Sequence, residues 1–441
     1  MKKEIPSLLV ADEKGRIFDV PGMRATGMKS GLFFPLRARD LVKLHSDSEL
    51  FMLPSRSAVG FSDDTGQMTE VATDPFSRKA RRCYAVAAFM SPGYTLRYNA
   101  SYVERKGAGH LPLFSYAAVA FYKGGFYAAG IRVDREKRQE LGGMDRTGLC
   151  DGVKKMRRIL PRNRLVRHLE TCALTYGCPA AKNFFLNRYE APLPSSPLCN
   201  ARCIGCISHQ EGGKCSVTQP RIKFVPDPEE IAEVALHHIS RVADPVVSFG
   251  QGCEGEPLMV GDVLVRAVSL IRKGTSKGII NINTNGSRPD MVSRLIDAGL
   301  DSIRVSVNSF QERYYNAYYR PVGYTFGDVM RSIRCMRKKR GFVSINYLVM
   351  PGFSDWIREE KALSRFLSGP GTDMIQWRNL NYDPIRYMNE LGVAISSREM
   401  LGMDKVIGKI KKEYPSIMNG YFNPSLKRIR RKRKGGSTAT L

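Results

Sequence analysis

The hydrophobic pattern of the chain changes near residue 190, and the change separates two kinds of predicted structure. Up to about residue 150, short apolar runs lie between clusters of glycine, proline, aspartate and serine, which is typical of β-strands. The clearest of these runs are residues 31–36, 50–54, 83–90, 116–122 and 126–133. The last two runs flank Lys123-Gly124-Gly125 and predict a hairpin, because glycine readily adopts the positive φ of such turns.

From residue 190 to 385, strand-like and helix-like segments alternate. Strands are predicted at residues 245–250, 279–285, 302–309, 343–349 and 374–380. Helices are predicted at residues 228–242, 258–273, 289–298, 326–339 and 354–367. With one more strand before residue 199, six β-α units fit, so we expect a parallel sheet or barrel whose active residues lie at the carboxyl ends of the strands.

The remaining segments are more basic. Residues 151–189 predict a helical connector, with Asp151 as its N-cap and Pro161 as a break. A helix near residues 397–412 belongs to a predicted C-terminal extension, and the basic end of the chain has the composition of a disordered tail. The predicted divisions are residues 1–150, 151–189, 190–385, 386–426 and 427–441.

Composition and charge narrow the class of protein. The 441 residues carry a net charge of +27, and removing the seven basic residues between 427 and 434 leaves 27 − 7 = +20. Such an excess favours polyanionic partners such as RNA, although a solvated basic surface explains it equally well. We find neither a signal peptide nor an apolar run of the ~18–20 residues that a membrane span needs. We therefore expect a cytoplasmic protein without membrane contact, whose ten cysteines are reduced.

Three of those cysteines stand out by their spacing. Cys199, Cys203 and Cys206 follow the C-x3-C-x2-C pattern, and prolines just before them exclude a helix, so the thiols should lie in a loop. A cubane iron–sulfur cluster normally takes four cysteines, so three leave one iron open for chemistry. A structural zinc site is the alternative, and it would need His209 or Cys215 as its fourth ligand.

This spacing resembles the signature of the radical S-adenosylmethionine (radical SAM) superfamily, whose partial (β/α)6 barrel matches the β-α repeats. The resemblance implies that the three cysteines hold a [4Fe–4S] cluster and that the amino and carboxylate groups of S-adenosyl-L-methionine (SAM) chelate the fourth iron. An electron donor such as flavodoxin or ferredoxin would allow the cluster to cleave SAM to a 5′-deoxyadenosyl radical, which abstracts hydrogen from the substrate. Gly205 departs from the family, which usually has an aromatic residue there, and this weakens an expected contact with adenine.

A second motif follows the second predicted strand. Gly255-Glu256-Pro257 looks like the family's Gly-Gly-Glu-Pro motif, with Glu254 in place of the first glycine. A carboxylate beside exposed backbone carbonyls suits an ammonium group, so we assign Gly255, Glu256 and Pro257 to SAM. The neighbouring Cys253 should not bind the cluster, because a fourth thiolate would block SAM.

Further candidates lie at later strand ends. Arg304, Ser306 and Asn308 share one face of a strand, and polar groups inside a barrel are costly unless they are hydrogen-bonded or meet a ligand. By resemblance, Ser306 and Asn308 would contact the ribose or carboxylate of SAM. The pocket is also assigned the polar residues of the last two strands, Asn346, Gln376 and Arg378.

The sequence therefore predicts an α/β protein: a partial (β/α)6 radical SAM core, a β-rich N-terminal domain and a short helical C-terminal extension. The expected activity is reductive cleavage of SAM, acting on an unknown substrate for which RNA and a peptide are candidates. The alternatives are a basic nucleic-acid-binding protein with a structural metal site, and an iron–sulfur protein that binds SAM without turnover. Two local questions stay open. Cys150, Cys172 and Cys178 could hold a second cluster or be buried thiols, and residues 55–57 could form an anion site or an ordinary turn.

Overall fold

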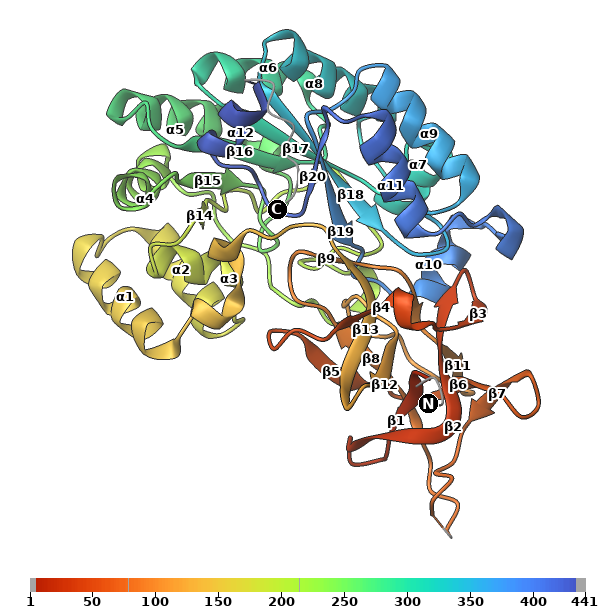
Figure 1. Ribbon diagram of the computed structural model, residues 1–441. Coiled ribbons are helices and arrows are strands. Elements are labelled where there is room, and N and C mark those ends of the chain that lie inside the picture. Colours follow the sequence, from red (N-terminus) through yellow and green to blue (C-terminus); the bar gives the residue numbers. More distant parts are fainter. Residues whose placement is uncertain (1–4, 78, 214, 434–441) are drawn as a thin grey trace. The chain divides into compact units, whose positions relative to one another are not determined.

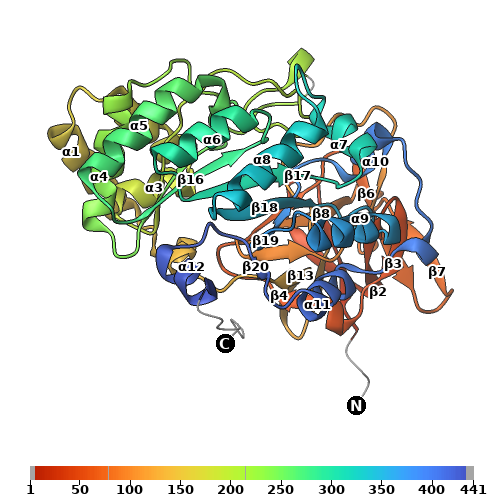
Figure 2. The same cartoon turned by 90° about the horizontal axis from the view of Figure 1, so that it is seen from above.

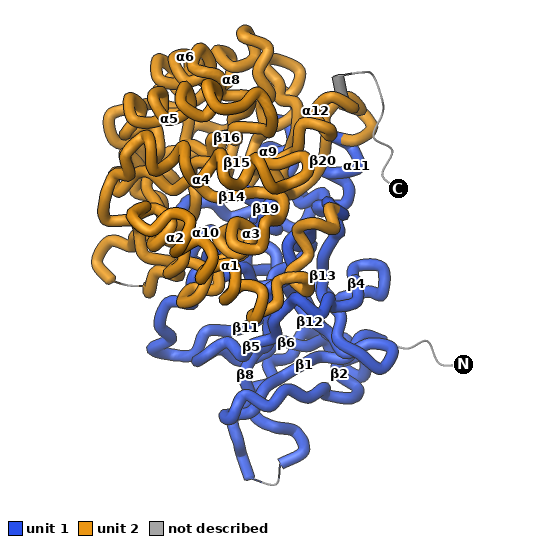
Figure 3. The backbone as a smooth tube through the Cα atoms, turned by 90° about the vertical axis from the view of Figure 1, so that its left-hand side faces the viewer, with its two compact units in different colours: residues 1–135, 348–362, 377–410 blue, residues 136–347, 363–376, 411–441 orange. Residues whose placement is uncertain are grey.

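The computed structural model describes residues 5–77, 79–213 and 215–433 (Figure 1). Contacts divide the chain into two compact units (Figure 3). Unit 1 comprises residues 1–135, 348–362 and 377–410, and unit 2 comprises residues 136–347, 363–376 and 411–441. Neither unit is continuous in sequence, and the predicted divisions of the chain stay predictions.

Unit 1 is built on a 13-stranded sheet whose paired strands are antiparallel, with the central order β11-β6-β2-β1-β12-β13-β4. This confirms the β-rich N-terminal region. The predicted hairpin forms, with Lys123 and Gly124 at φ values of 49° and 70° in its turn. The strands are β1 Ser7–Ala11, β2 Ile17–Lys29, β3 Leu32–Pro35, β4 Leu41–Lys43, β5 Glu49–Met52, β6 Arg56–Ser62, β7 Gln67–Val71, β8 Tyr84–Phe89, β9 Tyr94–Leu96, β10 Asn99–Ala100, β11 Tyr102–Glu104, β12 Val119–Tyr122 and β13 Gly125–Arg132.

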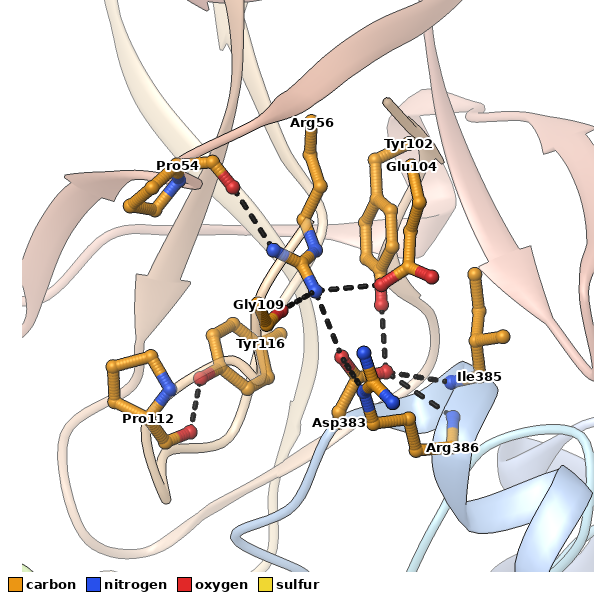
Figure 4. A network of polar contacts seen from close by, with 10 residues as sticks. All are labelled: Pro54, Arg56, Tyr102, Glu104, Gly109, Pro112, Tyr116, Asp383, Ile385 and Arg386. Carbon is orange, nitrogen blue, oxygen red and sulfur yellow. Dashed lines mark hydrogen bonds and ion pairs between the residues drawn. The ribbon is translucent and has the colours of Figure 1, made fainter. Parts of the chain in front are cut away.

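A buried polar network ties the later segments of unit 1 to this sheet (Figure 4). The Arg56 guanidinium donates to Glu104 Oε1 at 2.6 Å and to Asp383 Oδ2 at 3.3 Å, and the Tyr102 hydroxyl donates to Asp383 Oδ1 at 2.9 Å. Asp383 is also the N-cap of α10 (Pro384–Leu391). The protein's own carboxylates therefore bind Arg56, which begins a strand rather than a turn.

Unit 2 contains a seven-stranded sheet in the order β14-β15-β16-β17-β18-β19-β20, and its pairs with a known register are parallel. This confirms the α/β core. All five strands predicted after residue 240 form, and the strand before the cysteines is β14. The strands are β14 Glu190–Pro192, β15 Val246–Phe249, β16 Ile279–Thr284, β17 Ser302–Val307, β18 Phe342–Val349, β19 Met374–Asn379 and β20 Met418–Gly420.

Helices of unit 2 follow the strands and pack on one another beside the sheet, with α4 on α5, α5 on α6 and α6 on α8 (Figure 2). The capping box predicted for α4 is present between Asp227 and Glu230. Helix α5 begins later than the predicted residue 258, because the 3₁₀ turn η5 (Pro257–Val260) continues the Gly-Glu-Pro loop before the helix. The helices that lie wholly in unit 2 between β14 and β18 are α4 Pro228–Arg241, α5 Gly261–Gly274, α6 Pro289–Ala298, α7 Glu312–Tyr319 and α8 Phe326–Lys338. Helix α9 (Ile357–Ser368) contains residues of both units, and α11 (Met403–Glu413) lies mostly in unit 1.

Two expectations for the flanking helices were wrong. The connector helix α1 (Arg146–Ile159) begins earlier than predicted, with Asp145 rather than Asp151 as its N-cap, because the Asp145 carboxylate accepts from the amide of Gly148 at 2.6 Å. Pro161 does separate it from α2 (Arg164–Leu174), and α3 (Pro179–Phe185) follows.

The second error concerns the C-terminus, where α12 (Leu426–Arg433) forms although disorder was predicted from residue 427. Leu426 and Ile429 pack on the buried cluster that contains Tyr189 and Val246, so two apolar residues anchor a strongly basic helix. The rest of the predicted tail lies outside the described residues. No helix in the described part of the chain is both long and apolar enough to cross a bilayer.

Candidate functional site

The three spaced cysteines lie in an irregular loop directly after β14, as their preceding prolines predicted. The loop is fixed through its backbone: Arg202 N donates to Tyr319 O at 2.9 Å and Ile204 N donates to Tyr318 O at 3.1 Å. These carbonyls end α7, where the last helical carbonyls lack partners within the helix. The cysteine loop therefore caps α7, an element that the sequence analysis missed although its tyrosines recur at helical spacing.

The Gly-Glu-Pro loop meets the cysteine loop directly. Gly255 N donates to Ser196 O at 2.6 Å, and Glu256 N donates to Leu198 O at 2.7 Å. A Cβ atom at Gly255 would lie 2.0 Å from Leu198 O, so only glycine permits this approach. The structure thus brings two of the predicted motifs, which are about 50 residues apart in sequence, into backbone contact.

Glu256 is buried beneath this contact. Its Oε1 accepts from Thr284 Oγ1 at 2.5 Å and from Leu258 N at 3.1 Å, and its Oε2 accepts from Asn285 N at 2.8 Å. Burial raises the pKa of this carboxyl to about 7 despite these hydrogen bonds. Asn285 also donates from Nδ2 to Asn200 Oδ1 at 2.9 Å, which links the carboxylate to the residue after Cys199.

Glu254, which replaces the first glycine of the family motif, holds the cysteine loop from the other side. Its Oε2 accepts from the amides of Ser195 and Ser196 at 2.8 and 3.1 Å. Its Oε1 accepts from the amides of Gly250 and Gln251, both at 2.7 Å. Burial raises the pKa of this carboxyl. A single side chain thus joins the start of the cysteine loop to the end of β15, a role that its place in a glycine-rich run did not reveal.

The thiols of the cysteine loop sit in a low-dielectric setting and form no disulfide. Burial raises the pKa of Cys199 to about 11, with a further contribution from the charge of Glu256, and burial raises that of Cys203. Cys206 Sγ lies 3.5 Å from Ser208 Oγ and 3.7 Å from Arg221 Nη2. Partly buried thiols of this kind become ligands when a metal cation replaces their protons.

The donor atoms of these three thiols are not gathered as tightly as a single zinc ion requires. At Zn–S distances of about 2.3 Å, tetrahedral geometry places sulfur atoms about 3.8 Å apart. Among the residues that the structure describes, Cys199, Cys203 and Cys206 form no group whose donor atoms all lie within 4.8 Å of one another, and neither His209 nor Cys215 completes one.

The later candidates pair with neighbours inside unit 2. Ser306 Oγ accepts from Asn346 Nδ2 at 3.0 Å, and these residues are register partners on β17 and β18. Asn308 is fully buried and donates to Tyr314 O at 3.1 Å, while Gln376 Oε1 accepts from Arg304 at 3.3 Å. Hydrogen bonds within the protein thus satisfy some of the polar atoms of these side chains. The assignment of these residues to SAM, and that of Arg378, stays a prediction.

Known proteins resemble part of the chain. Residues 193–362 match the model of the radical SAM superfamily. The FeMo cofactor biosynthesis protein NifB of Klebsiella pneumoniae is 25% identical over 177 residues, which cover 37% of this chain and 37% of NifB. The chain thus matches little more than a third of that curated relative.

Solved structures resemble the chain more distantly. Methylornithine synthase is 16% identical, with 61% of this chain and 77% of that chain covered and a TM-score of 0.37. A radical SAM methyltransferase from Sphaerobacter thermophilus is 15% identical, with coverage of 46% and 63% and a TM-score of 0.34. Coproporphyrinogen III oxidase from Escherichia coli is 12% identical, with coverage of 56% and 58% and a TM-score of 0.35.

Proposed function

The chain belongs to the radical SAM superfamily through the domain at residues 193–362, and on that basis we propose that it is a SAM-cleaving radical enzyme. The contact between the cysteine loop and the Gly-Glu-Pro loop carries the proposal, because it places a buried carboxylate beside the first of the three thiols. A structural zinc site has no need for that carboxylate.

Cys199, Cys203 and Cys206 would hold a [4Fe–4S] cluster by three of its irons and leave the fourth open to SAM. When bound, the cluster and SAM would supply the electron and the 5′-deoxyadenosyl radical that abstracts hydrogen from the substrate. The surrounding residues position these groups. Glu254 fixes the start of the cysteine loop, and Gly255 lets the second loop approach its backbone.

Glu256 has the properties of a receptor for the SAM ammonium group. A carboxylate offers about four acceptor positions, and the three hydrogen bonds to Glu256 leave one at Oε2. Because burial raises the pKa of Glu256 to about 7, its charged form gains from a cation nearby. Ser306 and Asn308 are proposed to contact the ribose or carboxylate of SAM on the strength of the family resemblance.

For the substrate we propose a polyanion such as RNA over a peptide. The net charge of +27 supports this choice. A flavodoxin or ferredoxin as reductant and a cytoplasmic location belong to the same proposal.

Anaerobic metal analysis with matched cysteine variants tests the cluster. The purified protein should contain iron and labile sulfide, and replacing Cys199, Cys203 or Cys206 by alanine should each remove most of both. Cys335→Ala, in α8, is the control and should keep them. Stoichiometric zinc at these three cysteines with no labile sulfide would refute the cluster, and SAM binding without 5′-deoxyadenosine would refute the enzyme.

A further inference from the structure

A second set of metal-binding side chains lies elsewhere in unit 2. The donor atoms of His168, Cys172 and Cys253 all lie within 4.8 Å of one another. His168 and Cys172 are four residues apart on α2 and so share one face of that helix. Cys253 comes from the loop after β15 and is buried, so two distant segments of the chain converge on one point.

The geometry matches a single tetrahedral ion. Cys172 Sγ lies 3.5 Å from His168 Nε2. With Zn–S near 2.3 Å and Zn–N near 2.05 Å, tetrahedral angles separate nitrogen and sulfur ligands by about 3.6 Å. A mixed imidazole and thiolate set is typical of zinc, whereas harder cations such as magnesium prefer oxygen.

Independent features of the surroundings point to the same place. Gln219 is 8% exposed, and its amide Nε2 has no hydrogen-bond partner among the described residues. Its side chain lies beside the loop that carries Cys253, because a Cβ atom at Gly252 would lie 3.6 Å from Gln219 Oε1. Cys178 is held close by a hydrogen bond from its amide to Cys172 O at 2.9 Å.

We propose that His168, Cys172 and Cys253 bind one zinc ion, and that the Cys178 thiol, which lies outside this group of donor atoms, moves in to become the fourth ligand. The ion replaces the thiol protons and holds α2 against the loop that follows β15. This loop is already fixed from both sides, since Ile222 N donates to Cys253 O at 2.7 Å and Glu254 holds the residues around it. The set differs from the second cluster that the sequence suggested, because Cys253 and His168 take part and Cys150 is outside the group.

Metal analysis of matched variants separates this site from the cluster. We expect one zinc per chain in the anaerobically purified protein. Replacing Cys199, Cys203 and Cys206 together by alanine should remove iron and keep zinc. Cys172→Ala and Cys253→Ala should remove most of the zinc and keep iron, and Cys335→Ala should keep both. Absence of zinc from the native protein, or zinc that persists in Cys172→Ala but disappears with the cluster cysteines, would overturn the proposal.

X-ray absorption at the zinc edge of the unmodified protein provides a test that does not depend on folded variants. We expect three sulfur ligands at about 2.3 Å and one nitrogen at about 2.0–2.1 Å. A first shell made only of oxygen and nitrogen would overturn the proposal, and so would four sulfur ligands without imidazole.

Discussion

The buried carboxylates of Glu254 and Glu256 lie two residues apart in the candidate site and have different roles. Two backbone hydrogen bonds to Glu254 come from the segment before the cysteine loop and two come from the end of β15, so its contribution is to hold backbone. Glu256 retains one acceptor position at Oε2 and lies beside Cys199. The first carboxylate is a positioning residue, and the second is the proposed contact to SAM.

Replacing Glu256 should therefore affect SAM and spare the cluster. We expect Glu256→Ala to keep its iron and sulfide and to bind SAM more weakly by roughly 1.5–3 kcal/mol, the usual worth of a hydrogen bond to a charged group. Anaerobic calorimetry of SAM binding measures the change. Unaltered affinity in a protein with a full cluster would remove Glu256 from the SAM site.

Gly255 provides a steric prediction. In Gly255→Ala the new methyl group would lie 2.0 Å from Leu198 O, so one of the two loops must move. We expect a loss of about 1–3 kcal/mol of stability, as for other overpacked sites, together with a lower iron content. Gly408→Ala is the control, because its Cβ would meet no atom within 4 Å. Equal thermal stability and equal iron content in both variants would contradict this account of the loop contact.

Sequence patterns could identify functional residues where the members of a motif are close together in the sequence. The cysteine spacing and the Gly-Glu-Pro motif were recognisable because each lies within a few adjacent positions. The roles of Glu254 and Arg56 were not, because their partners are backbone amides and carboxylates far along the chain. Long-range hydrogen bonds leave no periodic signal.

Helices and strands were predictable where burial repeats with their period. The parallel strands of unit 2 appeared in the sequence as short runs rich in valine and isoleucine, residues that favour strands. The errors in the predicted helices were at their ends, because a single capping or packing contact can decide where a helix begins or ends. Asp145 caps α1 by accepting from Gly148 N, and two apolar residues give α12 a buried anchor within a basic segment.

A buried histidine in helix α4 leads to a prediction about how the stability of the protein depends on pH. His238 is fully buried, and burial lowers its pKa to about 4 from the usual value of 6.5. The unfolded chain takes up this proton below pH 6.5 while the folded chain does not, so its contribution to stability is complete above pH 6.5. It is lost as the pH falls toward 4, and a shift of this size corresponds to about 3 kcal/mol.

His238→Gln should accordingly make stability less sensitive to pH between 6.5 and 4. Denaturant unfolding at several pH values measures this slope. His209→Gln, at an exposed position, is the control and should leave the slope unchanged. His237, whose pKa burial also lowers to about 4, keeps part of the dependence in the His238 variant. An identical slope in the His238 variant and the unmodified protein would contradict the assignment.

Over the whole chain, the least predictable feature is how distant segments combine. Hydrophobic periodicity says nothing about which strands share a unit, and residues 377–410 join the N-terminal sheet in unit 1. The Arg56–Asp383 pair accounts for part of this association, since the two groups are separated by 327 positions and both are almost fully buried.

Removing one member of this pair should destabilise unit 1 strongly. Asp383→Ala leaves the Arg56 guanidinium with one carboxylate fewer and removes the cap of α10, and loss of a buried partner typically costs about 3–5 kcal/mol. Asp404→Ala breaks the pair between Arg97 and the half-exposed Asp404, so it should cost about 1 kcal/mol or less. Thermal or denaturant unfolding compares the two, and equal losses would contradict the importance of the buried network.

Formation of 5′-deoxyadenosine tests the central claim most directly. The anaerobically reconstituted protein is incubated with SAM and dithionite, and the nucleoside is quantified by mass spectrometry beside Cys203→Ala and Cys335→Ala. We predict 5′-deoxyadenosine from the unmodified protein and from Cys335→Ala, and none from Cys203→Ala. A fully iron-loaded protein that yields no 5′-deoxyadenosine, or equal yields from Cys203→Ala, would contradict the assignment of this chain as a radical SAM enzyme.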